Sequence, residues 1–128
     1  MTAVLDASAV LALLLGEAGA TKVASVLSEA QISAVNYAEV FTHYAKLGVS
    51  QADIEDLVGS LSIAIVPFDG ELAKVAGMLR PLTIEAGLSL GDRCCLALAK
   101  SATLPAWTAD RQWKYVAAAI GVKVVLIR

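Results

Sequence analysis

The amino-acid sequence predicts an α/β fold in which a parallel β-sheet is covered by helices on both faces. Three observations support this: short apolar runs alternate with longer helical stretches, 58% of the residues are hydrophobic, and the chain has 128 residues. Alternating strands and helices are typical of βαβ units. Strands of a parallel sheet are buried on both faces, which accommodates a hydrophobic content above the roughly 45–50% of ordinary domains. The length predicts a single domain.

Five short runs of β-branched or apolar residues are the expected strands. They lie at residues 3–5, 32–35, 63–66, 106–108 and 122–127. The stretches between them have helical spacing. Parallel strands joined by right-handed helical crossovers all point the same way. We therefore expect the residues that follow each strand, and the first turns of the following helices, to share one edge of the sheet.

Capping residues predict where the helices of the first half begin and end. Gly16 is expected to close the first helix, and Gly48 is expected to end a helix that begins near Asn36. Ser50 and Asp53 have the spacing of a capping box for the next helix. The apolar segment 7–15 that follows Asp6 is interpreted as a buried helix.

The second half of the chain carries two further helix starts. Asp69 is expected to cap a helix that runs until Pro81 stops it. Ser89 is expected to cap the helix that contains the adjacent thiols Cys94 and Cys95. An apolar helical pattern follows these thiols, which indicates reduced core residues rather than a disulfide or a metal site.

Four acidic side chains stand just after the predicted strands or in the first turn of the following helix. Asp6 directly follows the first strand, and Asp110 follows the strand at 106–108. Glu39 follows the second strand, and Asp92 follows Ser89. We expect all four carboxylates at one edge of the sheet. Carboxylates held together repel one another, so protons or a cation must neutralise them.

The chemistry of this acidic cluster indicates a metal-dependent phosphoryl-transfer site. Oxygen ligands without His or Cys select Mg²⁺ or Mn²⁺, whose remaining positions are filled by water and substrate phosphate. Such an ion lowers the pKa of a bound water and neutralises charge on phosphate during in-line attack. Helix N-termini around the cleft favour ionised acids and bound phosphate. The net charge of −2 provides no overall basic field, so nucleic-acid chemistry would rely on metal ions and local Arg or Lys.

Four short motifs contain these acids. They are Val4-Leu5-Asp6-Ala7-Ser8, Asn36-x-x-Glu39, Leu90-Gly91-Asp92-Arg93 running into Leu96-Ala97-Leu98-Ala99, and Thr108-Ala109-Asp110-Arg111-x-Trp113. In order and spacing they resemble the PIN-domain ribonucleases, and within them most of all the VapC-type toxins of toxin–antitoxin modules. The resemblance covers essentially the whole chain. One such motif is weak evidence, whereas four in register are specific.

The resemblance implies a three-layer αβα sandwich with a central, mainly parallel five-stranded sheet, as a single PIN-like domain over residues 1–128. It implies a hydrolase, namely a Mg²⁺- or Mn²⁺-dependent endoribonuclease that cleaves single-stranded RNA as the toxin of a type II toxin–antitoxin system. By the same resemblance the catalytic metal ligands are Asp6, Glu39, Asp92 and Asp110. The supporting residues are Ser8, Asn36, Thr108 and Arg93.

The resemblance also implies a homodimer that is silenced by a cognate VapB-like antitoxin. The chain departs from the family pattern in one respect. Many relatives carry a further Asp or Asn shortly after the last acid, where this chain has Gln112 and Lys114. The number of metal ions, one or two, therefore stays open, as do the RNA target, its cleavage sequence and the identity of the antitoxin.

Each acid also has a purely structural interpretation. Asp6 and Asp110 stand where a helix N-cap would stand, and a lone Asp there is more often a cap than a ligand. Capping does not account for Glu39, which lies among apolar neighbours, or for Asp92, which precedes a run of Cys, Leu and Ala. With all four acids predicted at one edge, the ligand interpretation is favoured over four coincident structural roles.

Other candidate side chains are interpreted more conservatively. His43 lies one turn beyond Glu39 and is expected to be a supporting or surface residue rather than a metal ligand. Arg93 is expected either to contact phosphate or to pair with a neighbouring acid. Trp107 and Trp113 are expected to pack in the core or an interface rather than to stack on bases.

Two other functional classes are considered beside the ribonuclease. A phosphoacceptor receiver-like signalling domain also builds an acidic Mg²⁺ pocket on a parallel sheet, but it expects paired acids after the first strand, and Asp6 is unpaired. The other is a catalytically silent PIN-fold binding partner, against which the intact set of four acids argues.

The expected location is the cytoplasm, without membrane association. No Lys or Arg precedes the apolar segment 7–15, Asp6 interrupts the apolar start of the chain, and the segment is too short to span a bilayer. The hydrophobic excess predicts further burial in an oligomer or a complex.

Overall fold

The computed structural model describes all 128 residues and contains a five-stranded, all-parallel sheet in the order β3-β2-β1-β4-β5. The strands are β1 (Ala3–Leu5), β2 (Ala30–Ser33), β3 (Ala64–Val66), β4 (Ala106–Thr108) and β5 (Val124–Leu126). The predicted parallel sheet is confirmed. Because β1 is the central strand, residues that follow it are flanked by the ends of β2 and β4.

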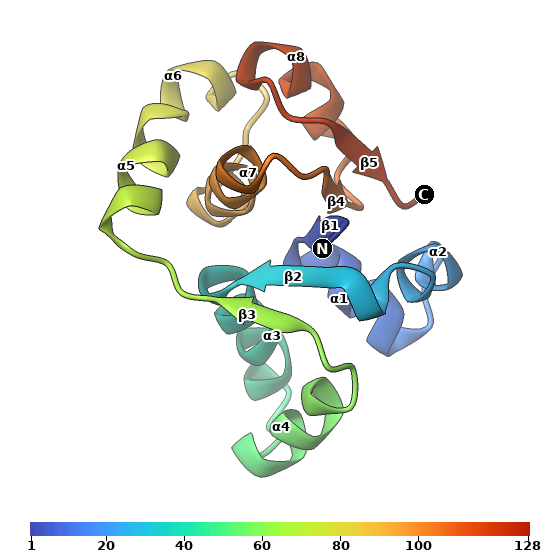
Figure 1. Ribbon diagram of the computed structural model, residues 1–128. Helices are drawn as coiled ribbons and strands as arrows, with labels where there is room; N and C mark the ends of the chain where they lie inside the picture. Colours follow the sequence, from blue (N-terminus) through green and yellow to red (C-terminus); the bar gives the residue numbers. More distant parts are fainter.

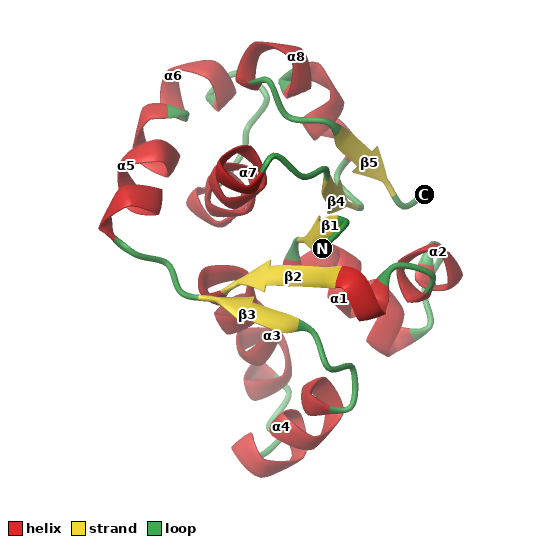
Figure 2. Cartoon of the chain, viewed as in Figure 1, coloured by secondary structure: helices red, strands yellow, loops and turns green.

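Helices cover both faces of this sheet, which confirms the predicted three layers (Figure 1, Figure 2). The first group is α1 (Ala7–Leu15), α2 (Ala20–Ala24), α3 (Ala34–Lys46) and α4 (Gln51–Gly59), with the 3-10 helix η1 (Leu27–Glu29). The second group is α5 (Gly70–Met78), α6 (Arg80–Thr83), α7 (Leu90–Ala102) and α8 (Ala117–Ile120), with the 3-10 helix η2 (Arg111–Tyr115). Figure 1 shows the two groups on opposite sides of the sheet.

Each face of the sheet packs a hydrophobic core of its own. Side chains alternate along a strand, so Val4 of β1 packs into the core with α5, α7 and α8, whereas Ala3 and Leu5 pack into the core with α1, α3 and α4. All three residues are completely buried. A sheet covered on both faces accounts for much of the chain's high hydrophobic content.

The second strand ends earlier than predicted. Ser33 has extended backbone angles and its Oγ accepts a hydrogen bond from the N–H of Val35 at 3.3 Å, so it caps α3. Ala34 and Val35, predicted as strand, are therefore helical. A β-branched residue such as Val35 favours a strand in isolation, and the serine cap overrides this preference.

Most of the predicted helix ends are confirmed. Gly16 closes α1 with a φ of 66°, Asp69 caps α5, and Ser50 caps α4, although only one of the two bonds of the predicted Ser50–Asp53 capping box forms. The prediction that Pro81 ends a helix is wrong. The helix α5 ends at Met78, and the proline lies in the first turn of α6, where its missing N–H is not needed.

The longest helices, α3 and α7, have 13 residues each. No helix combines the length and the apolar character that crossing a bilayer requires.

Candidate metal centre

The four acids singled out from the sequence all stand at the carboxyl edge of the sheet. Asp6 follows β1 and caps α1, and Asp110 follows β4 and caps η2. Glu39 lies in the second turn of α3, which follows β2. Asp92 is the third residue of α7. Three acids therefore follow the central strands β2, β1 and β4, and the fourth lies at the start of α7, the helix that leads into β4.

Asp6 is the most deeply placed of the four, with 4% of its surface exposed. Its Oδ1 accepts hydrogen bonds from the N–H of Ala9 at 2.9 Å and from the Oγ of Ser8 at 2.7 Å. Its Oδ2 accepts a hydrogen bond from the Oγ1 of Thr108 at 2.6 Å. A carboxylate buried without such donors would be strongly unfavourable, so Ser8 and Thr108 are what make this position tolerable.

The same two hydroxyls join the start of α1 to the end of β4. The Ser8 Oγ accepts a hydrogen bond from the N–H of Ala109 at 2.9 Å, and the Thr108 Oγ1 accepts one from the N–H of Asp110 at 3.0 Å. The two hydroxyl oxygens lie 3.4 Å apart. This small network fixes the Asp6 carboxylate relative to the backbone of Asp110.

Glu39 is exposed to solvent and held from α3. Its Oε1 accepts a hydrogen bond from the Nδ2 of Asn36 at 2.7 Å, and the same Nδ2 donates to the carbonyl oxygen of Gly91 at 3.0 Å. Asn36 is 1% exposed, and its Oδ1 is buried without a partner. A Cβ atom at Gly91 would lie 2.7 Å from Cδ and 2.8 Å from Oε1 of Glu39. Glycine at this position therefore leaves room for the Glu39 carboxylate where it now lies, a role for Gly91 that the sequence motif did not indicate.

Asp92 and Asp110 both take part in helix capping. The Asp92 Oδ2 accepts a hydrogen bond from the N–H of Ser89 at 2.8 Å, and the Ser89 Oγ accepts one from the N–H of Asp92 at 3.2 Å. Capping therefore accounts for Asp92, contrary to the sequence-based expectation. Asp110 is exposed, and its Oδ1 accepts a hydrogen bond from the N–H of Gln112 at 2.9 Å.

The acids at this edge influence one another's ionisation. Burial raises the pKa of Asp6 to about 6 although its three hydrogen bonds lower it, and the charge of Asp92 raises it further. Burial also raises the pKa of Asp92, and the charge of Asp110 adds to this effect. Each additional negative charge makes ionisation of its neighbour less favourable. A cation at this edge would reverse this effect.

The two thiols of α7 lie behind the acids and are free and buried, which confirms them as reduced core residues. Burial raises the pKa of Cys95 well above its usual range, and the charges of Asp6, Asp92 and Glu39 raise it further. Burial also raises the pKa of Cys94. Both thiols therefore stay protonated at neutral pH and offer no thiolate to a metal.

The carboxylates do not form a preorganised coordination sphere. No three His, Cys, Asp or Glu side chains lie close enough together to hold a metal ion as they stand. The four acids nevertheless offer only oxygen donors, which suit Mg²⁺ or Mn²⁺. Asp6 is buried and accepts three hydrogen bonds, whereas Glu39 and Asp110 are exposed and each accepts one. The residues present thus fit a divalent ion in the chemistry of their donor atoms.

The remaining candidate residues contribute little to this edge. The Nη1 of Arg93 donates to the carbonyl oxygen of Ala76 at 3.0 Å, so the arginine ties α7 to α5. Of its two expected roles, an ion pair with an acid does not form, and phosphate contact stays a prediction. Trp113 is completely buried in the core beside α7, and Trp107 packs against the opposite core, which confirms the packing interpretation for both. His43 belongs to no metal-binding group.

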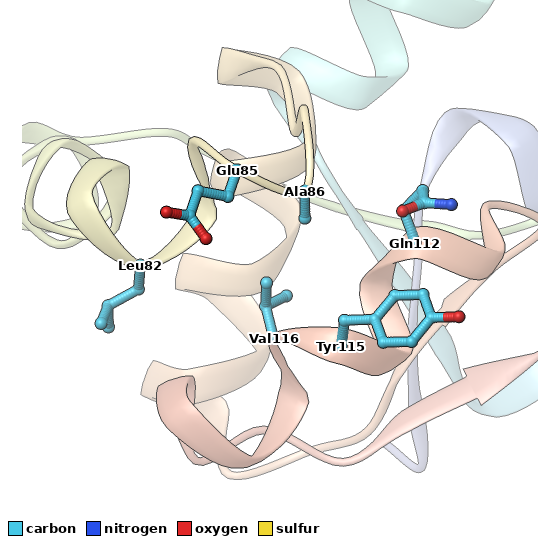
Figure 3. Close-up of a pocket in the computed structure, with 6 residues that line it drawn as sticks. All are labelled: Leu82, Glu85, Ala86, Gln112, Tyr115 and Val116. Atoms are coloured by element: carbon cyan, nitrogen blue, oxygen red, sulfur yellow. The ribbon is translucent and has the colours of Figure 1, made fainter.

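Two hollows flank the acidic edge. One, of about 350 Å³, runs between α1 and α3 and is lined by Ala7, Leu11, Glu39, Thr42, His43 and Lys46. It begins at the Glu39 carboxylate and ends at an exposed lysine that forms no ion pair. The other, of about 280 Å³, lies between the loop after α6 and η2, where Gln112 contributes to its lining (Figure 3). Neither hollow was predicted from the sequence.

Comparison with known proteins identifies the fold. A model of the PIN domain matches residues 3–119. No curated protein is recognisably similar in sequence. Similar solved structures include a toxin–antitoxin complex from Klebsiella pneumoniae, with 23% identity, a TM-score of 0.71 and coverage of 99% of this chain and 98% of that chain. FitAcB from Neisseria gonorrhoeae shows 23% identity, a TM-score of 0.70 and 98% coverage of both chains. VapBC2 from Rickettsia felis, bound to promoter DNA, shows 15% identity, a TM-score of 0.73 and 98% coverage of both chains.

Asp6→Asn is expected to stabilise the metal-free protein at neutral pH. The carboxyl has a pKa of about 6 in the fold against an ordinary value of 3.8. Its stabilising contribution is therefore full below about pH 4 and is lost as the pH rises through about 6. At pH 7.5 in EDTA, the free energy of unfolding from urea denaturation should be about 1–3 kcal/mol higher in the variant than in the wild type.

Asp69→Asn is the matched control for this measurement. Asp69 caps α5 through the same kind of hydrogen bond, to the N–H of Leu72 at 2.9 Å, but it is exposed. We expect a change of less than about 0.5 kcal/mol, because Asn and Asp are equivalent N-caps. A gain for Asp6→Asn that persists unchanged at pH 4.5, or an equal gain for Asp69→Asn, would contradict the account of Asp6.

Gly91→Ala is expected to displace the Glu39 carboxylate, because the new Cβ would overlap its atoms. The Glu39 side chain is flexible and exposed, so the melting temperature should change by no more than a few degrees. Affinity for Mn²⁺, measured by calorimetric titration, should fall about 10-fold. Gly77→Ala is the control, since a Cβ at Gly77 of α5 meets nothing within 4 Å. Unchanged Mn²⁺ affinity in Gly91→Ala would remove Glu39 from the site.

Proposed function

This chain belongs to the PIN domain family, and from that membership we propose that it is a Mg²⁺- or Mn²⁺-dependent endoribonuclease that cleaves single-stranded RNA. The observation that carries the proposal is the buried Asp6 carboxylate, held by two hydroxyls at an edge where three further acids stand. Asp6, Glu39, Asp92 and Asp110 are the proposed metal ligands. Ser8, Thr108 and Asn36 are the proposed supporting residues, and Arg93 supports the site only indirectly, by anchoring α7.

The proposed mechanism relies on carboxylates that hydrogen bonds position at the sheet edge. When bound, the metal ion supplies Lewis-acid chemistry, since it acidifies a water molecule and neutralises phosphate charge. Ser8 and Thr108 orient the Asp6 carboxylate and prevent it from rotating away. Asn36 holds Glu39 against Gly91, and Ser89 holds Asp92 at the start of α7. Asp110 and Glu39 are exposed, so they face the solvent from which an RNA strand approaches.

We further propose that the enzyme is the toxin of a type II toxin–antitoxin system. Support comes from the similar solved structures, which are a toxin–antitoxin complex and the VapBC2 and FitAcB assemblies. A VapB-like antitoxin and a second copy of the chain are the proposed partners, in the cytoplasm. The receiver-like alternative is set aside, because receiver domains have the strand order 2-1-3-4-5 and this sheet has 3-2-1-4-5.

The hollow between α1 and α3 supports an RNA substrate. It leads from Glu39 past His43 to Lys46, and its walls carry the apolar residues Ala7 and Leu11. In a chain with a net charge of −2, such a local cation is what a phosphate next to the cleavage site would require. We therefore assign Lys46 to the binding of one backbone phosphate.

Purified protein freed of antitoxin is expected to cleave single-stranded RNA in Mg²⁺ or Mn²⁺ and not in EDTA. Asp6→Asn and Asp92→Asn should each lower the cleavage rate about 100-fold, because each removes a negative oxygen from the metal site. Cleavage is followed with a fluorescent oligoribonucleotide pool on denaturing gels. Asp69→Asn, the cap substitution away from the acidic edge, should cleave at the wild-type rate, and full activity in both site variants would refute the assignment.

Lys46→Ala is expected to weaken RNA binding through the loss of one phosphate contact. The slope of log affinity against log salt for a single-stranded oligonucleotide, measured by fluorescence anisotropy in EDTA, should become less steep by about 0.7. Lys123→Ala is the control, because Lys123 precedes β5 and so stands at the opposite edge of the sheet. If both variants change the salt slope equally, the hollow between α1 and α3 does not carry the phosphate.

A further inference from the structure

The hollow between the α6–α7 loop and η2 has the composition of a site for one planar base. Its volume of about 280 Å³ falls just under the roughly 300–1,000 Å³ of sites for drug-sized ligands. It is lined by Leu82, Glu85, Ala86, Gln112, Tyr115 and Val116. Figure 3 shows the Tyr115 ring and the Gln112 side chain on one side, Glu85 on the other, and Ala86 and Val116 between them.

This hollow, called the η2 pocket below, adjoins the proposed metal centre. The N–H of Gln112 donates to the Asp110 carboxylate at 2.9 Å, so one residue of the pocket wall contacts one proposed ligand. The opposite wall belongs to the loop that leads into α7, where Ser89 and Asp92 form the capping box. A strand of RNA with its scissile phosphate at the acids would therefore bring a neighbouring nucleotide to this pocket.

The side chains of the η2 pocket match the surfaces of a base. Tyr115 is 69% exposed and is the one aromatic residue among the exposed large hydrophobic side chains. The Nζ of Lys114 lies 5.1 Å from the centroid of that ring and adds positive charge beside it. Single-stranded bases are recognised by stacking on such rings and by hydrogen bonds to their edges. Ala86 and Val116 supply an apolar floor.

The polar groups of the pocket favour one kind of base edge. The Glu85 carboxylate can only accept hydrogen bonds, whereas the Gln112 amide both donates and accepts. Among RNA bases, guanine presents two adjacent N–H donors on its Watson–Crick edge, which a carboxylate accepts as a pair. Glu85 is exposed and forms no ion pair, so it is free to accept them.

We propose that the η2 pocket binds an unpaired guanine next to the scissile phosphate, stacked on Tyr115 and recognised by Glu85 and Gln112. The inference rests on the proposed ribonuclease function and adds a base preference to it. Tyr115 provides stacking for any base, and Glu85 provides the discrimination. The pocket thus gives the enzyme a base preference at one nucleotide position beside the cleaved bond.

The first test uses metal-free protein and mononucleotides, so that it does not depend on cleavage. The full chain, labelled with ¹⁵N, is titrated with GMP, AMP, CMP, UMP and ribose 5-phosphate. We expect GMP to shift the amide signals of residues 82–86 and 112–116 at about 10-fold lower concentration than the other nucleotides. Ribose 5-phosphate should leave these signals in place. Tyr115→Ala should weaken the response to all four nucleotides.

Glu85→Gln is the decisive variant, with Glu29→Gln as its control. Both substitutions remove one exposed negative charge, and Glu29 lies in η1 and lines neither of the two hollows. We expect Glu85→Gln to abolish the preference for GMP and Glu29→Gln to preserve it. A preference for GMP that survives Glu85→Gln would overturn the inference, as would an equal response to ribose 5-phosphate. Amide signals that no nucleotide shifts would also overturn it and would indicate that the pocket binds a protein partner instead.

The second test separates this inference from the proposed function. Single-stranded RNA of random sequence is cleaved in Mn²⁺ and the new ends are sequenced. We expect guanine to be enriched at one fixed position beside the cut, and the enrichment to fall about 10-fold in Glu85→Gln. Cleavage whose preferences are identical in wild type and Glu85→Gln overturns the base site and leaves the nuclease assignment intact. GMP-specific shifts in a protein that cleaves no RNA support the base site and overturn the nuclease assignment.

Discussion

The burial of one carboxylate at the end of the central strand is the constraint on which the rest of this structure depends. Asp6 terminates β1, so it is surrounded by the ends of β2 and β4 and by the helix starts that follow them. Desolvation works against its charge, and its pKa of about 6 records that cost even after three hydrogen bonds have lowered it. No Lys or Arg forms an ion pair with Asp6 that would offset this cost. A divalent cation bound beside Asp6 would stabilise the ionised carboxylate.

The walls of the site come from helices on opposite faces of the sheet. The helix α3 packs into the core shared with α1 and α4, and α7 packs into the core on the other face. They meet beyond the sheet edge, where the buried Asn36 donates to the carbonyl oxygen of Gly91 and to Glu39. Gly91 has no side chain, which is what lets the Glu39 carboxylate come this close to α7. Part of the acidic edge therefore depends on packing between layers that the sheet itself keeps apart.

The sequence was sufficient for a parallel five-stranded sheet and for the edge on which the acids stand, but not for the order of the strands. Alternating apolar runs predicted five parallel strands, and their order along the chain placed Asp6 and Asp110 after β1 and β4. Boundaries were harder to predict, because local caps compete with residue preferences. Ser33 makes Val35 helical, and Pro81 begins α6 rather than ending the preceding helix.

Side-chain partners were the least predictable feature, because they depend on contacts between distant segments. Arg93 has no acidic partner and bonds instead to the Ala76 carbonyl of α5, 17 positions earlier in the chain. Asp92 follows Ser89 at the spacing of a capping box, a signal that was present in the sequence but was not applied to this acid. The two hollows that flank the acids are lined by residues of separate elements, so no local sequence motif predicts them.

The central claim is that these four separated acids come together around a divalent ion, with Asp6 as the fixed member. It is tested most directly by growing crystals with Mn²⁺ and recording anomalous diffraction from the metal. The account predicts an anomalous peak beside the Asp6 carboxylate, with at least two of Glu39, Asp92 and Asp110 turned toward it. A metal held by other residues, or an Asp6 carboxylate with no ion near it at saturating Mn²⁺, would contradict the claim.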